Sequence, residues 1–299
     1  MWSSGLAAFL WCGTAQAADP RVPAHQPVPV VASFSILGDL VRVVGGDRVV
    51  VTSLVGPDAD AHIFEPKPSD AKAVAQARLL VTNGLGFEPW ATQLAQAAGY
   101  RGTSVVASQG VQARTLAQDH GPAQSDPHAW QNPNNVIVYV RNIEVGLSRV
   151  DPAGAAMFQR NADAYAQELL ALDGFAKTQF ATIAAGRRKV ITSHDAFGYF
   201  GAHYGIQFFA PQGVSTNAEP SAKGVAQLIR QIRREKIKSV FLENMSNPRL
   251  LTQLSQDAGV TVGGRLYADA LSGPNTPGAT YLQMVRHNVT QLTAGMRLN

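Results

Sequence analysis

The sequence contains a single cysteine, Cys12, among its 299 residues. It lies in an apolar stretch near the N-terminus that we expect to be removed from the mature chain. Disulfide bonds and thiolate ligands are therefore excluded from the remainder of the protein. Any metal site there must use His, Asp or Glu, the other side chains that commonly bind transition metals.

Charged residues are also scarce. Only 15% of the residues are charged, against about 25% in an average protein. The hydrophobic fraction is 45%, which excludes an intrinsically disordered chain. Lys and Arg number 25, Asp and Glu number 21, and the basic residues form no long run. We therefore expect no nucleic-acid partner.

The first 17 residues carry no charge and resemble an export signal. A short apolar run, Leu6 to Cys12, precedes the small-x-small sequence Ala15-Gln16-Ala17. This pattern predicts a signal peptide over residues 1–17, because the run is much shorter than the roughly 20 residues of a membrane span. Trp11 stands where a lipoprotein needs a small residue before Cys12, so we do not expect lipidation. A signal peptide usually begins with basic residues, which are missing here, so the position at which translation starts is left open.

Strands and helices alternate along the rest of the chain, which predicts parallel α/β sheets. The expected strands cover residues 28–34, 48–54, 78–82, 103–107, 189–193, 207–210, 239–243 and a segment near Val260. The expected helices cover residues 36–44, 69–77, 88–98, 134–149, 196–204, 221–235, 248–258 and 280–296. Residues 108–127 are polar and predict a loop.

One long helix is expected between these two alternating regions. Asp151 and Pro152 are typical of a helix start, no other proline occurs before Gly186, and apolar residues recur at helical spacing. Such a helix would span roughly 50 Å, with a kink possible at Gly174. The predicted fold has two Rossmann-like parallel-sheet lobes joined by a long rigid helix. We divide the chain into a signal peptide (1–17), an N-terminal lobe (18–150), a linking helix (151–186) and a C-terminal lobe (187–299).

Three histidines and one aspartate lie where predicted strands end or loops begin: His62, His128, His194 and Asp269. Ligands of parallel α/β proteins bind at the carboxyl ends of strands. These four residues are far apart in sequence, so they could meet only if the two lobes face each other. An isolated histidine is more often an ordinary surface or core residue, which is our interpretation of His25, His203 and His287. His120 lies in the loop before His128 and is a candidate accessory metal contact.

Several motifs in order resemble the metal-binding solute-binding proteins of bacterial ABC importers for zinc and manganese. They include Phe34 to Leu40, Asp60 to Asp70, Asn83 to Trp90, Asp126 to Trp130, Thr192 to Phe200, Ala218 to Ser221, Phe241 to Asn244 and Tyr267 to Asp269. The resemblance covers nearly the whole mature chain. It implies two α/β lobes joined by a rigid helix, with a metal ion between them bound by His62, His128, His194 and Asp269.

The resemblance also bears on which metal is carried. Manganese members of this family tend to have glutamate at the position of His194. Three imidazoles and one carboxylate suit Zn²⁺, whereas Mn²⁺ prefers more oxygen ligands. The expected cargo is therefore Zn²⁺, with manganese binding as the alternative. The long histidine-rich loop of many zinc members is short here and has one histidine, and the second-lobe disulfide of some members is absent.

The function implied is periplasmic capture of Zn²⁺ and its delivery to the membrane permease of an ABC importer, without enzymatic activity. A periplasmic metallochaperone is a second candidate partner, and we expect a monomer. Glu243 is the candidate partner that orients a ligand imidazole, while Asp60 and Glu65 could shape the first ligand's loop. Two other functions remain open: a zinc hydrolase with an open fourth position, although no His-Glu-x-x-His sequence occurs, and a surface adhesin on the same scaffold.

Overall fold

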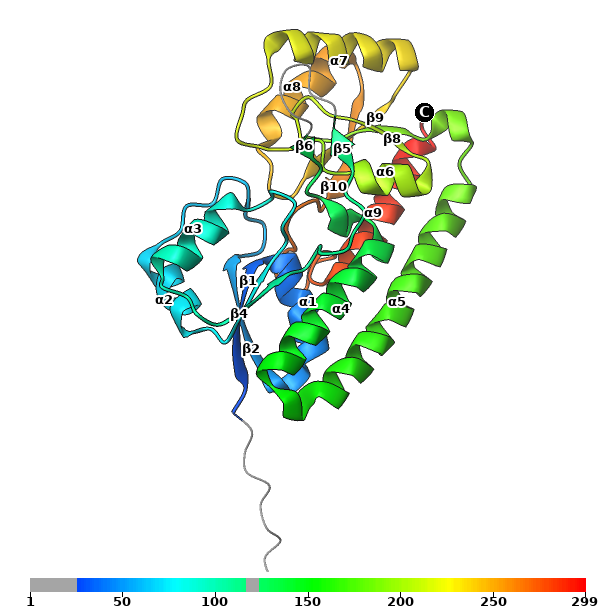
Figure 1. Cartoon of the computed structure of the whole chain (residues 1–299). Coiled ribbons are helices and arrows are strands. Elements are labelled where there is room, and N and C mark those ends of the chain that lie inside the picture. Colours follow the sequence, from blue (N-terminus) through cyan, green and yellow to red (C-terminus); the bar gives the residue numbers. More distant parts are fainter. Residues whose placement is uncertain (1–25, 117–123) are drawn as a thin grey trace, which may run out of the picture.

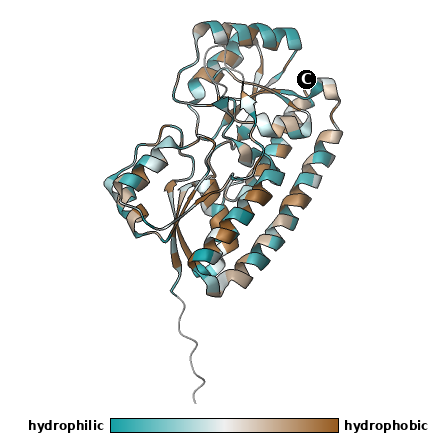
Figure 2. Cartoon of the chain, viewed as in Figure 1, coloured by the Kyte–Doolittle hydropathy of each residue, from teal (hydrophilic) through white to brown (hydrophobic). Residues whose placement is uncertain are grey.

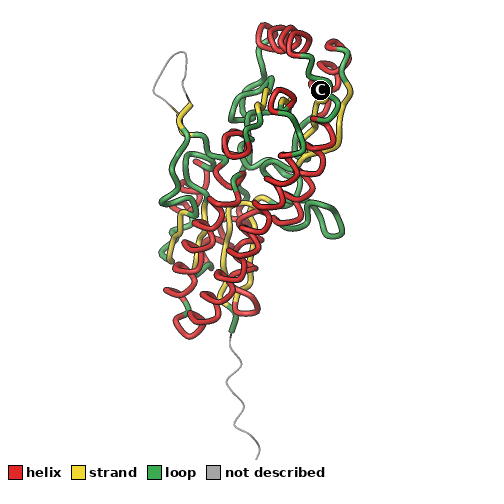
Figure 3. Tube along the Cα trace, turned by 90° about the vertical axis from the view of Figure 1, so that its right-hand side faces the viewer, coloured by secondary structure: helices red, strands yellow, loops and turns green. Residues whose placement is uncertain are grey.

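The computed structural model describes residues 26–116 and 124–299. The predicted signal peptide, with Cys12, and the histidines His25 and His120 lie outside these residues. Figures 1 and 3 show two sheets towards opposite ends of an elongated molecule, with helices running along its length. The alternation of strands and helices in the sequence is thus confirmed. No helix in the described ranges is long and apolar enough to cross a membrane.

The first sheet is parallel and has the strand order β2-β1-β3-β4. Buried valines and leucines fill its central strands β1 and β3, as expected for a sheet covered on both faces. Its strands are β1 (Val28–Phe34), β2 (Val49–Val55), β3 (Leu79–Thr82) and β4 (Thr103–Val106). Its helices are α1 (Ser35–Gly45), α2 (Pro68–Gln76), α3 (Pro89–Ala97) and α4 (Pro133–Val150).

The second sheet is also parallel, with the order β10-β9-β7-β8. Its strands are β7 (Lys189–Ile191), β8 (Gln207–Phe209), β9 (Ser239–Glu243) and β10 (Thr261–Leu266). The accompanying helices are α6 (Gly198–Tyr204), α7 (Ala222–Glu235), α8 (Pro248–Ala258) and α9 (Tyr281–Met296). Most of these elements begin and end within two residues of the predicted positions.

The long linking helix is present but shorter than predicted. Helix α5 covers Ala155–Ala181, 27 residues, or about 40 Å at 1.5 Å per residue. Asp151 is the N-cap residue, as predicted, but of a short 3₁₀ turn, Pro152–Gly154, that leads directly into α5, and its carboxylate pairs with Arg48 at 2.7 Å. The helix also ends earlier than predicted, at Ala181 instead of near Gly186. The helix continues through Gly174 without a break, because its buried stripe packs continuously on both sides of that residue.

The region predicted as a plain loop, residues 108–127, contains a short antiparallel pair. Strands β5 (Thr115–Leu116) and β6 (Gln124–Ser125) pair with each other and form a third, two-stranded sheet. The prediction missed them because two-residue strands carry no hydrophobic alternation.

The larger of the two hydrophobic cores in the described residues spans both lobes, and the smaller one, around Ile191, Leu228 and Leu251, lies within the C-terminal lobe. The larger core is a continuous cluster of buried residues that extends from β1 through α4 and α5 to α9 at the C-terminus, and Figure 2 colours many residues of these helices brown, that is, hydrophobic. Tyr281, the first residue of α9, is fully buried and reaches the N-terminal lobe twice. Its N–H donates to Asp39 (2.8 Å) and its hydroxyl donates to the carbonyl of Trp130 (2.7 Å). The lobe boundaries at residues 150 and 187 stay a prediction.

Replacing Phe180 of α5 should destabilise the whole protein. The ring is 1% exposed and packs on Phe200 and Tyr204, with centroid distances of 5.8 and 5.3 Å. We expect Phe180→Ala to lower the free energy of unfolding by about 3–5 kcal/mol, the usual cost of a buried phenylalanine. Leu170→Ala, on the same helix but 47% exposed, is the control and should change it little. Equal effects in denaturant unfolding would contradict this packing.

Candidate metal centre

Four side chains from the loops of both sheets lie together in the interior. The side chains of His62, His128, His194 and Asp269 each offer one ligand atom, and these atoms lie within 4.8 Å of one another. The relative exposure is 9% for His62 and 0% for the other three. The structure therefore brings together all four residues that the sequence singled out, and we refer to them as the metal cluster.

The parallel topology explains why these residues meet. His62 lies in the connection from β2 to α2, His194 follows β7, and Asp269 follows β10. All three thus lie beyond the carboxyl ends of parallel strands, where ligands bind in such sheets. His128 comes directly before the 3₁₀ turn Ala129–Gln131, which leads into α4.

The Asp269 carboxylate lies at the centre of the cluster. Its oxygens are 3.3 Å from Nε2 of His62, 3.6 Å from Nε2 of His128 and 3.0 Å from Nε2 of His194. These three nitrogens and both carboxylate oxygens are buried without a hydrogen-bond partner. Buried polar groups rarely remain unpaired in proteins, so five unpaired atoms directed at one point fit a cation.

The other ring nitrogen of His194 is held by Glu243, as the sequence predicted. Nδ1 of His194 pairs with Oε2 of Glu243, and Oε1 accepts the backbone N–H groups of Ser193 (2.9 Å) and His194 (3.1 Å). Both residues are almost fully buried. This arrangement fixes the ring orientation and directs Nε2 into the cluster, which is the usual role of a carboxylate behind a metal-binding histidine.

His128 has an equivalent partner that the sequence analysis did not single out. Oδ1 of Asp126 is 2.9 Å from Nδ1 of His128 and accepts its backbone N–H at 3.0 Å. The signal available was the aspartate two residues before the histidine, in Asp126-Pro127-His128. The second Asp126 oxygen lies 3.4 Å from the Arg114 guanidinium. The Asp126 carboxylate therefore links the cluster to a partly exposed arginine.

The loop that carries His62 is shaped by Asp60, as expected. Its Oδ1 accepts the backbone N–H of His62 at 2.8 Å. Glu65, the other acidic residue considered, is exposed. The imidazole of His62 packs edge-on against the ring of Phe87, with 4.8 Å between centroids.

Two tryptophans fix the residues that precede two of the cluster members. The indole N–H of Trp90 donates to the carbonyl of Ala61 at 2.8 Å, and that of Trp130 donates to the carbonyl of Ala268 at 3.0 Å. Ala61 precedes His62, and Ala268 precedes Asp269. Trp130 also packs on the His128 ring, 5.2 Å between centroids. The two indole hydrogen bonds thus fix the backbone next to His62 and next to Asp269.

Burial and mutual charge shift the pKa values within the cluster. Burial raises the pKa of Asp269, but the neighbouring His194 and His128 outweigh it and hold this pKa well below its usual range. For His128, burial lowers the pKa, whereas Asp269 and Asp126 together raise it to about 8. The pKa of His194 is likewise lowered by burial but raised more by Glu243 and Asp269, and it lies well above the usual value. The imidazoles of His128 and His194 therefore take up protons readily in the absence of a cation.

Two other histidines have ordinary roles, as the sequence analysis assumed. Nε2 of His203 lies 2.7 Å from the Asp173 carboxylate on α5, and Nε2 of His287 lies 2.8 Å from the carbonyl of Arg265. Neither is near the metal cluster. His25 and the accessory candidate His120 lie outside the described residues.

Comparison with known proteins places the chain among metal-uptake proteins. Residues 30–295 match a family described as the periplasmic component A of the zinc-uptake complex. The chain is 33% identical over 271 residues to the manganese-binding lipoprotein MntA of Halalkalibacterium halodurans, covering 89% of the chain and 88% of that protein. It is 31% identical over 266 residues to the iron-binding protein YfeA of Yersinia pestis, covering 89% and 85%. Among solved structures, the periplasmic zinc-binding protein TroA of Treponema pallidum matches with a TM-score of 0.86 at 27% identity, covering 91% of this chain and 99% of that one.

Cation binding by the cluster should weaken as the pH falls. His128, with a pKa of about 8, holds a proton below that pH and must release it to a metal. Affinity should therefore be highest above about pH 8 and fall by up to about tenfold per pH unit for each proton displaced. Titration with a competing chelator between about pH 9 and 6 measures this. Asp126→Asn should move the onset to lower pH, and constant affinity across the range would contradict the expectation.

Proposed function

The chain belongs to the family of periplasmic component A of zinc-uptake complexes, and from this premise we propose that it captures one Zn²⁺ between its lobes. Members of this family are metal-binding substrate-binding proteins of ABC importers and not enzymes. Such a protein carries its ion as cargo and passes it to a membrane permease driven by an ATPase. The hydrolase alternative is thereby set aside.

The observation that carries the proposal is the set of unpaired donor atoms in the metal cluster. Three imidazole nitrogens and one carboxylate form a nitrogen-rich site, and four ligands satisfy the tetrahedral geometry that Zn²⁺ favours. We propose His62, His128, His194 and Asp269 as these ligands. Glu243 and Asp126 would hold two of the imidazoles in the tautomer that presents Nε2 to the ion.

Manganese is the second candidate cargo. Relatives such as MntA of Halalkalibacterium halodurans are named as manganese-binding. Both oxygens of Asp269 lack a hydrogen-bond partner, so the carboxylate can offer two oxygens to an ion that prefers oxygen ligands. Even then, nitrogen would supply three of the five donor atoms, which favours Zn²⁺.

Capture draws ligands from both lobes to one ion. The N-terminal lobe supplies His62 and His128, and the C-terminal lobe supplies His194 and Asp269. Because the ion must join both halves, occupancy is coupled to the distance between the lobes. The continuous helix α5 and the shared core limit that movement, so we propose that the bound and free forms differ by a small rearrangement.

Export and assembly are proposed from the sequence. The leader would be cleaved after Ala17, placing the protein in the periplasm. Some relatives are named lipoproteins, and the mass of the exported protein would distinguish cleavage at Ala17 from lipidation at Cys12. A monomeric state, and loading by a metallochaperone, also remain proposals.

The protein should retain Zn²⁺ in preference to Mn²⁺. Dialysis of the protein against equal concentrations of both ions, followed by metal analysis, should give one Zn²⁺ and little Mn²⁺ per chain. The reason is the excess of imidazole ligands, together with the greater intrinsic affinity of such sites for Zn²⁺. Equal retention of both ions, or retention of Mn²⁺ alone, would assign the chain to manganese uptake.

Removing individual members of the cluster should weaken Zn²⁺ binding unequally. Asp269→Ala leaves three imidazoles and should lower the affinity, while His194→Ala leaves its lobe with only Asp269 and should lower it further. Both losses should exceed the roughly 10–100-fold effect of removing an outer-shell partner. His287→Ala, outside the cluster, is the matched control. Calorimetric titration showing wild-type affinity for Asp269→Ala would identify another group as the fourth ligand.

A further inference from the structure

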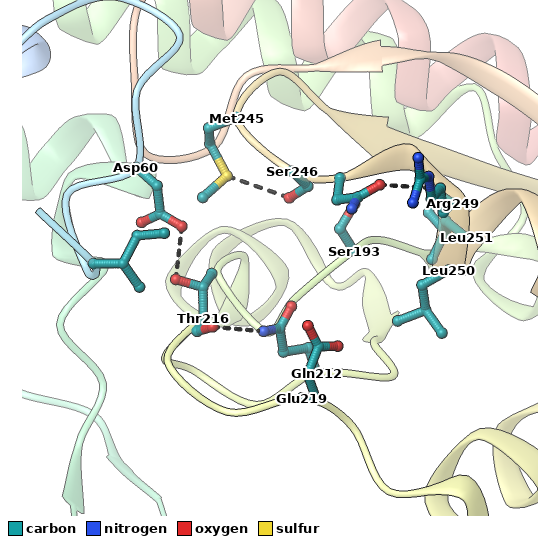
Figure 4. Close-up of a pocket in the computed structure, with 12 residues that line it drawn as sticks. Asp60, Ser193, Gln212, Thr216, Glu219, Met245, Ser246, Arg249, Leu250 and Leu251 are labelled. Carbon is teal, nitrogen blue, oxygen red and sulfur yellow. Dashed lines mark hydrogen bonds between the residues drawn. The ribbon is translucent and has the colours of Figure 1, made fainter.

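A cavity of about 380 Å³ lies beside the metal cluster, between loops of the two lobes. Asp60 and Ile63 line it from the N-terminal lobe, and Ser193, Gln212 and Thr216 line it from the C-terminal lobe (Figure 4). Three of these residues are close in sequence to cluster members, and Ile63 directly follows His62. Asp60 precedes His62 by two residues, and Ser193 is adjacent to His194.

One carboxylate in this cavity joins the two lobes. Oδ1 of Asp60 accepts the backbone N–H of His62 at 2.8 Å, and Oδ2 accepts the hydroxyl of Thr216 at 2.7 Å. Figure 4 shows the Asp60 and Thr216 side chains directed at each other and joined by this hydrogen bond. The backbone of a proposed ligand in one lobe is thus connected through a single side chain to a loop of the other.

The loop that bears Thr216 is itself tied to the cluster. Gln212, at its start, pairs with His194 in a parallel β-bridge. The side-chain amide of Gln212 donates to the carbonyls of Thr216 and Ala218, at 3.0 Å each. The position of the Thr216 hydroxyl therefore follows the position of the His194 backbone.

Among the four cluster members, His62 is the only one with measurable exposure, at 9%. The neighbouring Ile63 is 57% exposed and lines the cavity. An ion that leaves the cluster must first lose a ligand, and we expect the least buried ligand, His62, to move away first. This places the route of release at the His62 loop, next to the cavity.

We propose that Asp60 and Thr216 form a latch that sets the rate at which the metal ion leaves the site. Asp60 is a positioning residue: it holds the His62 loop against the C-terminal lobe while His194 and Asp269 hold the ion from that lobe. When the hydrogen bond from Thr216 is absent, the His62 loop moves away more often and the ion escapes through the cavity. This inference rests on the proposed metal-binding function.

A second contact between the lobes keeps the rest of the loop in place. Asp58 accepts the side-chain amide of Asn244 at 2.8 Å and the hydroxyl of Ser272 at 2.7 Å, and its N–H donates to the carbonyl of Leu271 at 2.8 Å. Loss of the Thr216 hydroxyl therefore leaves the loop anchored at Asp58. Only the half of the loop that carries His62 is released.

The test compares three variants of the full chain loaded with Zn²⁺, or with Mn²⁺ if that is the ion the wild type retains. Thr216→Val removes the hydroxyl at nearly constant volume, and Thr216→Ser restores it. Thr276→Val is the matched control, because Thr276 is also half-buried and its hydroxyl also makes a 2.7 Å hydrogen bond, to Gly273. Release is followed by stopped-flow capture of the ion with an excess of a coloured chelator, and thermal unfolding of the metal-free protein is measured in parallel.

We expect Thr216→Val to accelerate release by at least about tenfold, as expected for loss of a hydrogen bond to a charged group. Thr216→Ser and Thr276→Val should release the ion at the wild-type rate, and the unfolding temperature of all metal-free forms should be similar. Wild-type release from Thr216→Val, or equal acceleration in Thr276→Val, would overturn the latch. Failure of the wild type to retain either ion would instead overturn the proposed function, and the latch with it.

Discussion

The carboxylate of Asp269, removed from water and surrounded by three imidazole nitrogens, is the constraint on which the site depends. Nothing in the described residues satisfies its oxygens by a hydrogen bond, and a buried anion of this kind is costly unless positive charge is near. Protons on His128 and His194 supply that charge in the metal-free protein. A divalent cation would supply more positive charge, so a metal ion and protons compete for the same buried carboxylate and imidazoles.

The surrounding structure serves to hold these atoms in place despite their origin in two lobes. Each carboxylate behind an imidazole also fixes the backbone of the same histidine, as Glu243 does for His194 and Asp126 for His128. Ring orientation and loop position are thereby set together. The hydrophobic core that extends through α5 and α9 likewise holds the two lobes in place relative to each other. We propose that a site built in this way needs little rearrangement to bind an ion.

Much of the fold and of the site could be predicted from the sequence, and the physical reason is not the same for the fold as for the site. The alternation of strands and helices is a local pattern, and the carboxyl ends of strands place His194 and Asp269 before any contact is known. Asp151 and Pro152 begin the helical segment as predicted, but its first turn, Pro152–Gly154, is a 3₁₀ turn, a distinction that the local sequence does not make. Asp126 was overlooked because its role depends on a 2.9 Å distance to Nδ1 of His128. The Asp60–Thr216 contact joins residues 156 positions apart, and no local pattern indicates it.

The two tryptophans that hold the cluster have a consequence for observing the protein. Trp90 and Trp130 are the tryptophans of the described residues, and each donates its indole N–H to the residue just before a cluster member. Trp90 is tied to the His62 side and Trp130 to the Asp269 side. Indole emission depends on the polarity and hydrogen bonding around the ring. Both tryptophans belong to the N-terminal lobe, but the acceptor of Trp130, the carbonyl of Ala268, belongs to the C-terminal lobe. The intrinsic fluorescence of Trp90 and Trp130 therefore reports on the site without an attached dye.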